Sequence, residues 1–487
     1  PLSPGYINAQ IVKILPQDNQ YCKCLFVNLY PFSMIRYSNN GTEHPVDACS
    51  ALTEANAESH VTYLCSSAYT FSREFLRCSM ATGKLQIQVT SELRATPVED
   101  AVIDISSTGE PDQILEEVRT DSVGQTDTLE LEAPPEEYSL SPGEMQPYSE
   151  YNFRITASGY EPLTISGAEI LANQLALQDI RLKPLAGSEK YDNVVIPAHT
   201  LYGNYPPKIA EAEIKPVSQS GEIVLSRVVV PEFVVVHDGA PTDSTAGDYY
   251  VRYRDYIKNV ASSEIYATWP KAAIRANVLA IMSFTLNRVY TEWYRNKGFD
   301  FTITSSTAFD HKWIYSRNIF ESISEVVDEL FADYLSRPNV KQPILTQYCD
   351  GKRVSCPNWL SQWGSKSLAD QGYTATEILR YYYGDNIYIN TAEEISGIPS
   401  SWPGYDLDIG ATGQKVEQMQ EQLNAISNNY PLIPRIAVDG IYGEETQNAV
   451  EVFQKIFGLP VTGIVDYRTW YKIQEIYVGV TRIAELR

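Results

Sequence analysis

The stretch Tyr256-Ile-Lys-Asn-Val-Ala-Ser-Ser-Glu-Ile-Tyr-Ala-Thr-Trp-Pro270 decides how the centre of this 487-residue chain folds. It leads into an Ala-rich segment, about Lys271 to Arg295, with apolar residues at helical spacing. Those residues are Ile274, Val278, Ile281 and Phe284. This spacing predicts a helix buried along one face, and Pro270 suits its first turn, where the missing N–H is no loss. Glu264 is therefore expected on a short segment packed against the N-terminal end of a core helix.

A carboxylate at such a position has two readings. It is either a cap-type residue stabilised by the helix dipole or a working acid. Helix-start glutamates are more often structural than catalytic, so Glu264 alone does not decide the function.

Residues 256–288 resemble the catalytic core of the SpoIID/LytB family of peptidoglycan lytic transglycosylases, where an acidic residue stands shortly before an Ala-rich helix. The matching residues are Tyr256, Ile257, Glu264, Trp269, Pro270, Ala273, Ala276, Ala280 and Leu286. A second matching block comprises Ser361-Gln-Trp-Gly364, Leu368-Ala369, Gln371-Gly-Tyr373 and Glu377-Ile-Leu-Arg-Tyr-Tyr-Tyr-Gly384. Two positions depart from the family: Met282 stands where an Arg is usual, and Cys356-Pro-Asn-Trp-Leu360 replaces a Gly-His-Gly-type segment.

The resemblance implies a mechanism that needs one carboxyl group. Glu264 would protonate the leaving oxygen of a MurNAc–GlcNAc bond and then take the proton of the muramic 6-hydroxyl, which attacks C1 and leaves a 1,6-anhydro sugar. This acid needs a raised pKa, which partial burial beside Trp269 would provide. The carboxylate pair of ordinary glycosidases is not required.

Two cysteines, Cys349 and Cys356, stand in the same region with six residues between them. They could be free buried thiols, a disulfide, or zinc ligands together with a histidine. Some SpoIID-like enzymes hold zinc near the catalytic Glu with two Cys and one His, and this resemblance implies that His311, Cys349 and Cys356 bind Zn²⁺. The reaction needs no activated water, which favours a structural zinc, while three protein ligands with an open fourth position permit either role.

Composition limits the function classes. The formal charge of −23 argues against nucleic acid and against anionic membranes or teichoic acids as partners, because phosphates are bound by Lys/Arg surfaces. No apolar run approaches the roughly 20 residues that span a bilayer. The 34 tyrosines are expected mainly in strands and cores, although exposed ones can stack on sugars.

The first 79 residues differ from the rest. They hold five of the seven cysteines (Cys22, Cys24, Cys49, Cys65 and Cys78) and lack clear periodicity. We expect Met80 to be the natural start and residues 1–79 to be a non-native upstream extension; the alternative is a small divergent domain. No signal peptide is detected after either start.

The remaining sequence predicts a multidomain α+β protein. Residues 80–186 alternate at period two between Gly and Pro turns and predict a β-sandwich; 187–227 are broken by prolines and read as a linker. Residues 228–395 form the predicted SpoIID-like α+β catalytic domain, and 396–406 a second linker.

Residues 407–478 resemble the common peptidoglycan-binding module, a three-helix domain. The matching residues are Asp408, Gly410, Gly413, Gln420, Asp439, Gly440, Gly443, Gln454, Gly463 and Trp470. The glycines and Asp439 are expected at turns and helix caps. The resemblance implies peptidoglycan as the ligand.

The order of these regions resembles that of spore cortex-lytic enzymes. That resemblance implies a zymogen in the cortex and coat region of the spore, activated during germination by a subtilisin-like protease. The sandwich would be the prosegment, with a plain spacer as the alternative. Two rival functions remain: a zinc amidase that cuts the muramoyl–alanine bond with Glu264 as base, and a non-catalytic cortex-binding scaffold.

Overall fold

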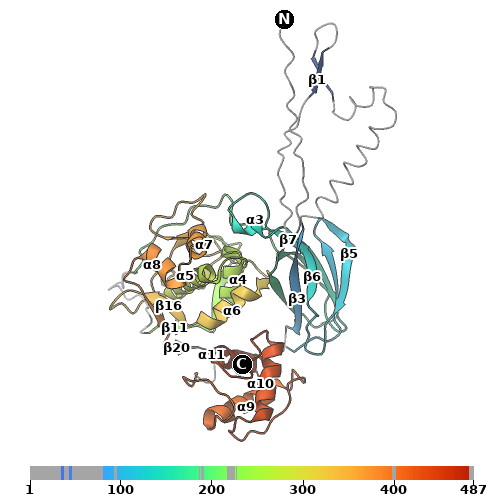
Figure 1. Ribbon diagram of the computed structural model, residues 1–487, viewed down its shortest axis with the longest axis vertical. Helices are drawn as coiled ribbons and strands as arrows, with labels where there is room; N and C mark the ends of the chain where they lie inside the picture. The colour runs from blue at the N-terminus through green and yellow to red at the C-terminus, as the bar shows by residue number, and fades with distance from the viewer. Residues whose placement is uncertain are drawn as a thin grey trace, which may run out of the picture. The chain divides into compact units, whose positions relative to one another are not determined.

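The computed structural model describes residues 80–92, 96–185, 187, 191–215, 225, 227–396 and 402–481, and the backbone of two short strands near the N-terminus (Figure 1). Those strands, β1 (Met34–Tyr37) and β2 (Glu43–Val46), pair antiparallel within a unit that ends at Cys78. The expectation that residues 1–79 are an extension, with their five cysteines, otherwise lies outside the described residues. Residues 79–487 form the second unit.

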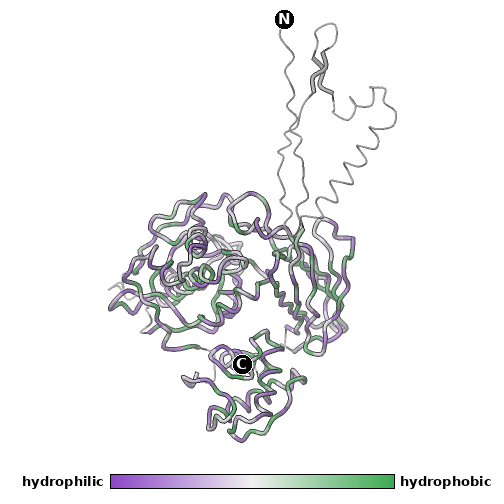
Figure 2. Tube along the Cα trace, in the orientation of Figure 1, coloured by the Kyte–Doolittle hydropathy of each residue, from purple (hydrophilic) through white to green (hydrophobic). Residues whose placement is uncertain are grey.

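The predicted β-sandwich is present. One sheet has the order β15-β9-β3-β6 and the other β10-β8-β7-β4-β5. The strands are β3 (Ala81–Ser91), β4 (Val102–Ser107), β5 (Glu110–Arg119), β6 (Leu129–Ala133), β7 (Tyr148–Thr156), β8 (Leu163–Leu171), β9 (Leu175–Leu182), β10 (Asp192–Val195) and β15 (Ile319–Phe320). Leu85, Ile87 and Val89 on β3 are buried on one face, as alternation requires, and the change of hydropathy along the strands can be followed in Figure 2. The short helix α3 (Glu137–Leu140) follows β6.

The region that the sequence predicts to be catalytic, called the catalytic region from here on, is built around helix α5 (Lys271–Tyr290). Its other elements are β11 (Val229–Val230), β12 (Phe233–His237), β13 (Asp248–Arg252), α4 (Tyr253–Glu264), β14 (Ile303–Thr304), α6 (Glu321–Leu330), β16 (Asp333–Ser336), β17 (Tyr348–Cys349), β18 (Leu360–Ser361), α7 (Gln362–Asp370), α8 (Ala375–Tyr383), β19 (Tyr388–Thr391) and β20 (Glu394–Ile395).

Helix α5 differs from the expectation in two ways. It is buried on nearly all sides rather than along one face, because α4, α6, α7, α8 and β16 surround it. A helix with small and apolar residues all round is suited to such a central position. It ends at Tyr290 rather than near Arg295, and Glu292 just beyond has φ 44°, outside the helical range.

Residues 191–215, within the stretch 187–227 that was predicted as a linker, are built into the structure instead. Strand β10 joins the sandwich beside β8, with Asp192 opposite Leu163. We call residues 196–215 the connecting segment. Its downstream half packs into the catalytic region: Glu211 pairs with Arg288 of α5 at 2.6 Å, and Ile209 N donates to Ala308 O at 2.7 Å. The prolines keep this segment from forming a helix or strand. Ion pairs and hydrogen bonds to the catalytic region nevertheless hold it in place.

The C-terminal domain consists of α9 (Gln414–Ile426), α10 (Glu444–Ile456) and α11 (Tyr467–Thr481), the three helices that were predicted. Two glutamines fasten its loops. Gln420 accepts a hydrogen bond from Gly440 N at 2.9 Å, and Gln454 accepts one from Gly463 N at 2.9 Å. Both glycines have φ near +65° (67° and 65°), so their predicted role in turns is confirmed.

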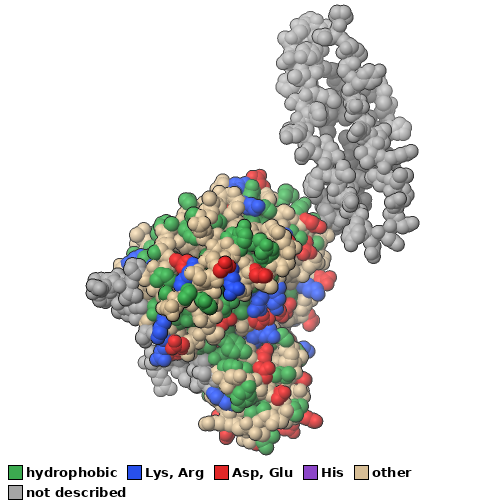
Figure 3. All heavy atoms as spheres, turned by 60° about the vertical axis from the view of Figure 1, so that its left-hand side comes forward, with side chains coloured by type: hydrophobic (Ala, Val, Ile, Leu, Met, Phe, Trp, Pro, Cys, Tyr) green, Lys and Arg blue, Asp and Glu red, His purple; other side chains and the backbone are tan. Residues whose placement is uncertain are grey.

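The surface carries charges of both signs. On the face shown in Figure 3, acidic and basic side chains are interspersed. Within the described part of the chain, none of the helices has the length and apolar character that a membrane span needs.

Candidate functional site

Glu264 is the last residue of α4, and its side chain is held by two neutral donors. It is 7% exposed. The backbone N–H of Lys312 donates to Oε1 at 2.7 Å, and Gln362 Nε2 donates to Oε2 at 2.8 Å. The same Gln362 amide donates to the backbone oxygen of Glu264 at 2.7 Å. The carboxylate is therefore fixed at the end of a buried helix.

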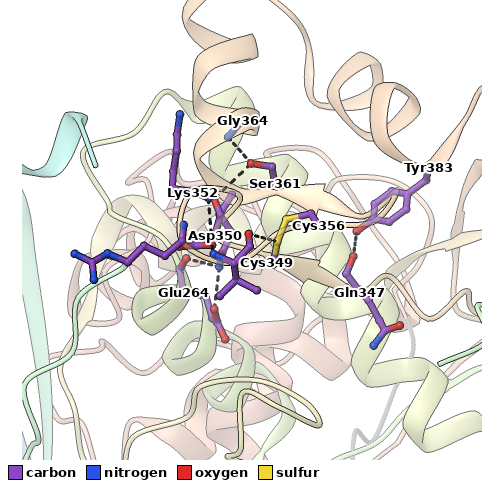
Figure 4. Close-up of a disulfide and its surroundings, with 12 residues drawn as sticks. Glu264, Gln347, Cys349, Asp350, Lys352, Cys356, Ser361, Gly364 and Tyr383 are labelled. Atoms are coloured by element: carbon purple, nitrogen blue, oxygen red, sulfur yellow. Dashed lines mark hydrogen bonds between the residues drawn. A yellow bond between two sulfur atoms is a disulfide. The ribbon is translucent and has the colours of Figure 1, made fainter. Parts of the chain in front are cut away.

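The two sequence blocks that resemble the SpoIID/LytB family meet at this carboxylate. Gln362 begins α7, whose N-cap Ser361 accepts a hydrogen bond from Gly364 N at 2.9 Å. Figure 4 shows Glu264 and this helix start in one close-up. Trp269 packs against Trp363, with ring centroids 4.9 Å apart. Residues about 100 positions apart thus form one site.

Glu264 faces a small pocket. Its lining from the catalytic region is Glu264, Thr307, Tyr348, Cys349, Asp350, Val354 and Gln362. The connecting segment supplies the rest: His199, Leu201, Tyr205, Pro206 and Lys208. The cavity volume is about 50 Å³. The connecting segment therefore lies over the pocket that Glu264 faces.

Several hydrogen bonds hold the upstream half of the connecting segment in place. His199 N donates to the Tyr148 hydroxyl at 2.8 Å, and Leu201 N donates to the Tyr266 hydroxyl at 3.0 Å. Arg353 donates to the side chain of Asn204 at 2.8 Å. These bonds attach the upstream half of the connecting segment, which we call the cover, to the sandwich, to the turn after α4 and to the loop that follows β17.

Lys208, which the sequence did not single out, places a cation beside the site. Its ammonium lies 4.3 Å from the centre of the Tyr348 ring. Burial lowers the pKa of Lys208 to about 8, and the negative charges of Glu264 and Asp310 oppose that effect. Desolvation, and then the charge of Glu264, raise the pKa of Tyr348 well above its ordinary value. A lone lysine in a Pro-rich stretch carries no sequence signal for this position.

Asp350 is a second carboxylate in the pocket that sequence reasoning did not single out. Its oxygens accept hydrogen bonds from the backbone N–H groups of Lys352, Arg353 and Val354, at 3.2, 3.0 and 2.8 Å. These bonds hold the turn between the two cysteines. The carboxylate is engaged in that turn, which favours a structural role over acid–base work.

Cys349 and Cys356 form a disulfide, one of the three alternatives open from the sequence (Figure 4). Disulfide sulfurs lack the thiolate charge that binds zinc. His311 is fully buried; its Nδ1 lies 3.2 Å from the Tyr256 hydroxyl and its ring 4.4 Å from that of Phe284. Burial, then the nearby cations, lower its pKa well below the ordinary value, so this imidazole is neutral.

The predicted zinc set is therefore not assembled. Among the described residues, no group of three or more His, Cys, Asp or Glu side chains is placed to hold a metal ion. The expectation that His311, Cys349 and Cys356 bind zinc does not fit this structure, and the physical reason is that the two sulfurs bond to each other. Met282, where the family has an arginine, is fully buried in the core.

Comparison with known proteins gives one domain-level match. Residues 412–473 match the family described as "Putative peptidoglycan binding domain". A curated relative, the N-acetylmuramoyl-L-alanine amidase CwlL of Bacillus licheniformis, is 26% identical over 231 residues, which are 45% of this chain. The chain spans 61% of the length of that relative.

Two solved structures are similar over short stretches. The SleB N-terminal domain is 28% identical, covering 16% of this chain and 99% of that one, with a TM-score of 0.14. The Bacillus anthracis TIE protein is 15% identical, covering 22% of this chain and 17% of that one, with a TM-score of 0.16. TM-scores this low support no conclusion about fold or function.

Proposed function

We propose that this protein is a peptidoglycan lytic enzyme of the SleC type, a lytic transglycosylase that acts on the spore cortex during germination. One observation carries the proposal: a buried glutamate, held by neutral donors, lies where two sequence blocks resembling the SpoIID/LytB family come together. The match of residues 412–473 to a peptidoglycan-binding family supports peptidoglycan as the ligand. Spore cortex and coat are the proposed location.

In the proposed reaction, Glu264 acts twice. As an acid it protonates the glycosidic oxygen, and the bond to C1 of MurNAc breaks as the leaving sugar departs. As a carboxylate it then accepts the proton of the 6-hydroxyl, whose oxygen bonds to C1 and closes the 1,6-anhydro ring. Atoms and charge balance without water, so no second carboxylate and no metal is needed.

The connecting segment covers Glu264, and this supports the proposal that the protein is made as a zymogen. The exposed residues Asn204, Pro206 and Pro207 lie in the middle of the connecting segment, where a protease can reach the chain. We infer that an activating protease, subtilisin-like by the resemblance, cuts between Leu201 and Pro207. A cut further on, within 208–215, would remove groups that the catalytic region needs.

The amidase relative makes N-acetylmuramoyl-L-alanine amidase the second candidate. An amidase of the zinc type needs a metal to activate water, and the proposed ligands do not form such a site here. The transglycosylase is therefore the better-supported proposal.

The test compares wild-type protein with Glu264→Gln, both cut in the connecting segment. Glutamine keeps the shape and removes the titrating group, so glycan cleavage should fall by at least about 100-fold, the usual contribution of acid–base catalysis. Purified cortex is digested, and the masses of the fragments are measured by mass spectrometry. Anhydro-muramic ends support the proposal; new peptide amino termini would identify an amidase, and wild-type turnover by the variant would remove Glu264 from the mechanism.

A further inference from the structure

Gln362 is the side chain that links Glu264 to the second half of the site. It is 4% exposed, and its Nε2 group donates both to Oε2 of Glu264 at 2.8 Å and to the backbone oxygen of Glu264 at 2.7 Å. One amide therefore fixes the direction of the carboxyl group and the end of α4 that carries it. No other described side chain makes two hydrogen bonds to Glu264.

The position of Gln362 is itself fixed. It is the first residue of α7, and its backbone oxygen accepts a hydrogen bond from the Ser365 hydroxyl at 2.7 Å. Ser365 in turn accepts a hydrogen bond from Asn277 of α5 at 2.7 Å. The backbone of Gln362 is thus held from the central helix by residues outside the connecting segment.

The neutral character of this donor matters for the chemistry. A lysine or arginine bonded to the carboxylate would favour its charged form and oppose the acid step, whereas removal of all donors would disfavour the charged form that the base step needs. Gln362 and the backbone N–H of Lys312 are neutral donors, so they favour the charged form less strongly than a bonded cation would.

We propose that Gln362 is the positioning residue that lets Glu264 act first as acid and then as base. This inference rests on the proposed function, since it assigns a role within the same reaction. Gln362 does not touch the reacting bond; it acts through Glu264.

The experiment uses the full chain, cut in the connecting segment, and three variants. Gln362→Met keeps the length and removes the donor; Gln362→Glu keeps the shape and restores a donor only when protonated. Gln342→Met is the matched control, because Gln342 is also a buried glutamine (5% exposed) whose amide holds distant backbone, at Lys215, away from Glu264.

Turnover on purified cortex glycan is measured as a function of pH. Loss of one hydrogen bond to a charged group should lower kcat in Gln362→Met about 10- to 100-fold, with KM little changed. The basic limb of its pH profile should move to higher pH, because the carboxylate loses a donor. Gln362→Glu should recover activity relative to wild type as the pH falls from about 7 to about 5, where carboxyl groups take up protons.

The outcomes distinguish failure of the positioning role of Gln362 from failure of the proposed function. Profiles of both Gln362 variants that match Gln342→Met would overturn the positioning role while Glu264 remains essential. If Glu264→Gln turns over normally, the proposed function itself fails. Thermal unfolding of each variant checks folding; should Gln362→Met not fold, the isosteric Gln362→Glu still decides through its pH dependence.

Discussion

Replacing Glu211 with glutamine should destabilise the catalytic region much more than the same change at Glu213. The Glu211 carboxylate accepts hydrogen bonds from Arg288 at 2.6 and 3.0 Å and also pairs with Lys215 at 2.5 Å. Arg288 is fully buried, and Asp310 is its remaining anion at 2.8 Å. The change leaves two cations and one carboxylate inside the protein. Removing one partner of a buried pair costs about 3–5 kcal/mol.

Glu213→Gln is the control in the same segment. Glu213 pairs with Arg337 at 2.6 Å, but the two side chains are 35% and 19% exposed, and such pairs contribute about 0–1 kcal/mol. At about 2–4 °C per kcal/mol for a region of this size, the expected Tm losses are about 6–20 °C for Glu211→Gln and at most about 4 °C for Glu213→Gln. Thermal unfolding followed by tryptophan fluorescence measures both. Equal losses would refute the assigned role of Glu211.

The stabilisation by Glu211 should also depend on pH. Burial raises the pKa of Glu211, but the hydrogen bonds and charge of Arg288 more than offset this, so the pKa is lowered. A carboxyl group with a lowered folded pKa contributes stability above its unfolded pKa, about 4.3, and loses it as the pH falls through the folded value. Below about pH 4 wild type should therefore lose stability more steeply than Glu211→Gln.

Three further predictions follow from the site. Replacing Cys349 and Cys356 with serine should lower stability by about 2.5 kcal/mol, the loop-closure value for a separation of 7 residues; unlinked cysteines in peptide maps of air-oxidised protein, or stoichiometric zinc by elemental analysis, would contradict the disulfide. Arg353→Ala should speed protease cutting of the connecting segment severalfold, and an unchanged rate would show that Arg353 does not hold the cover. A chain beginning at Lys208 should fold, whereas one beginning at Ser226 should not; equal Tm values would show that the anchors within residues 208–215 are not needed for folding.

The sequence pattern singles out Glu264, whose catalytic role stays a prediction, and the structure adds Gln362 as its neighbour. Glu264 and Gln362 belong to two blocks whose spacing resembles one family, and the structure places their side chains 2.8 Å apart. The alternation of β3 and the glycine turns of the C-terminal domain are likewise local patterns, and local patterns are what a single sequence displays.

The cover could not be predicted in the same way. The anchors of the connecting segment are contacts with residues far along the chain, such as Glu211 with Arg288, and no periodicity marks them. The cysteine pair shows the same limit, because spacing alone is compatible with thiols, zinc or a disulfide. Position 350 carried no motif, and its role depends on the backbone amides of the turn that it closes.

Strand β15 has a consequence for the timing of activation. It belongs to the catalytic region by sequence, yet it extends a sheet of the sandwich, with Ile319 opposite Leu177. The buried pair Arg317–Glu169, at 2.7 Å, joins the same two regions. A protease that severs the chain near Asn204 would therefore leave two fragments still bound to each other. Under the proposed function, the delay before cortex is degraded would be set by how fast those fragments separate, a first-order step independent of protease concentration.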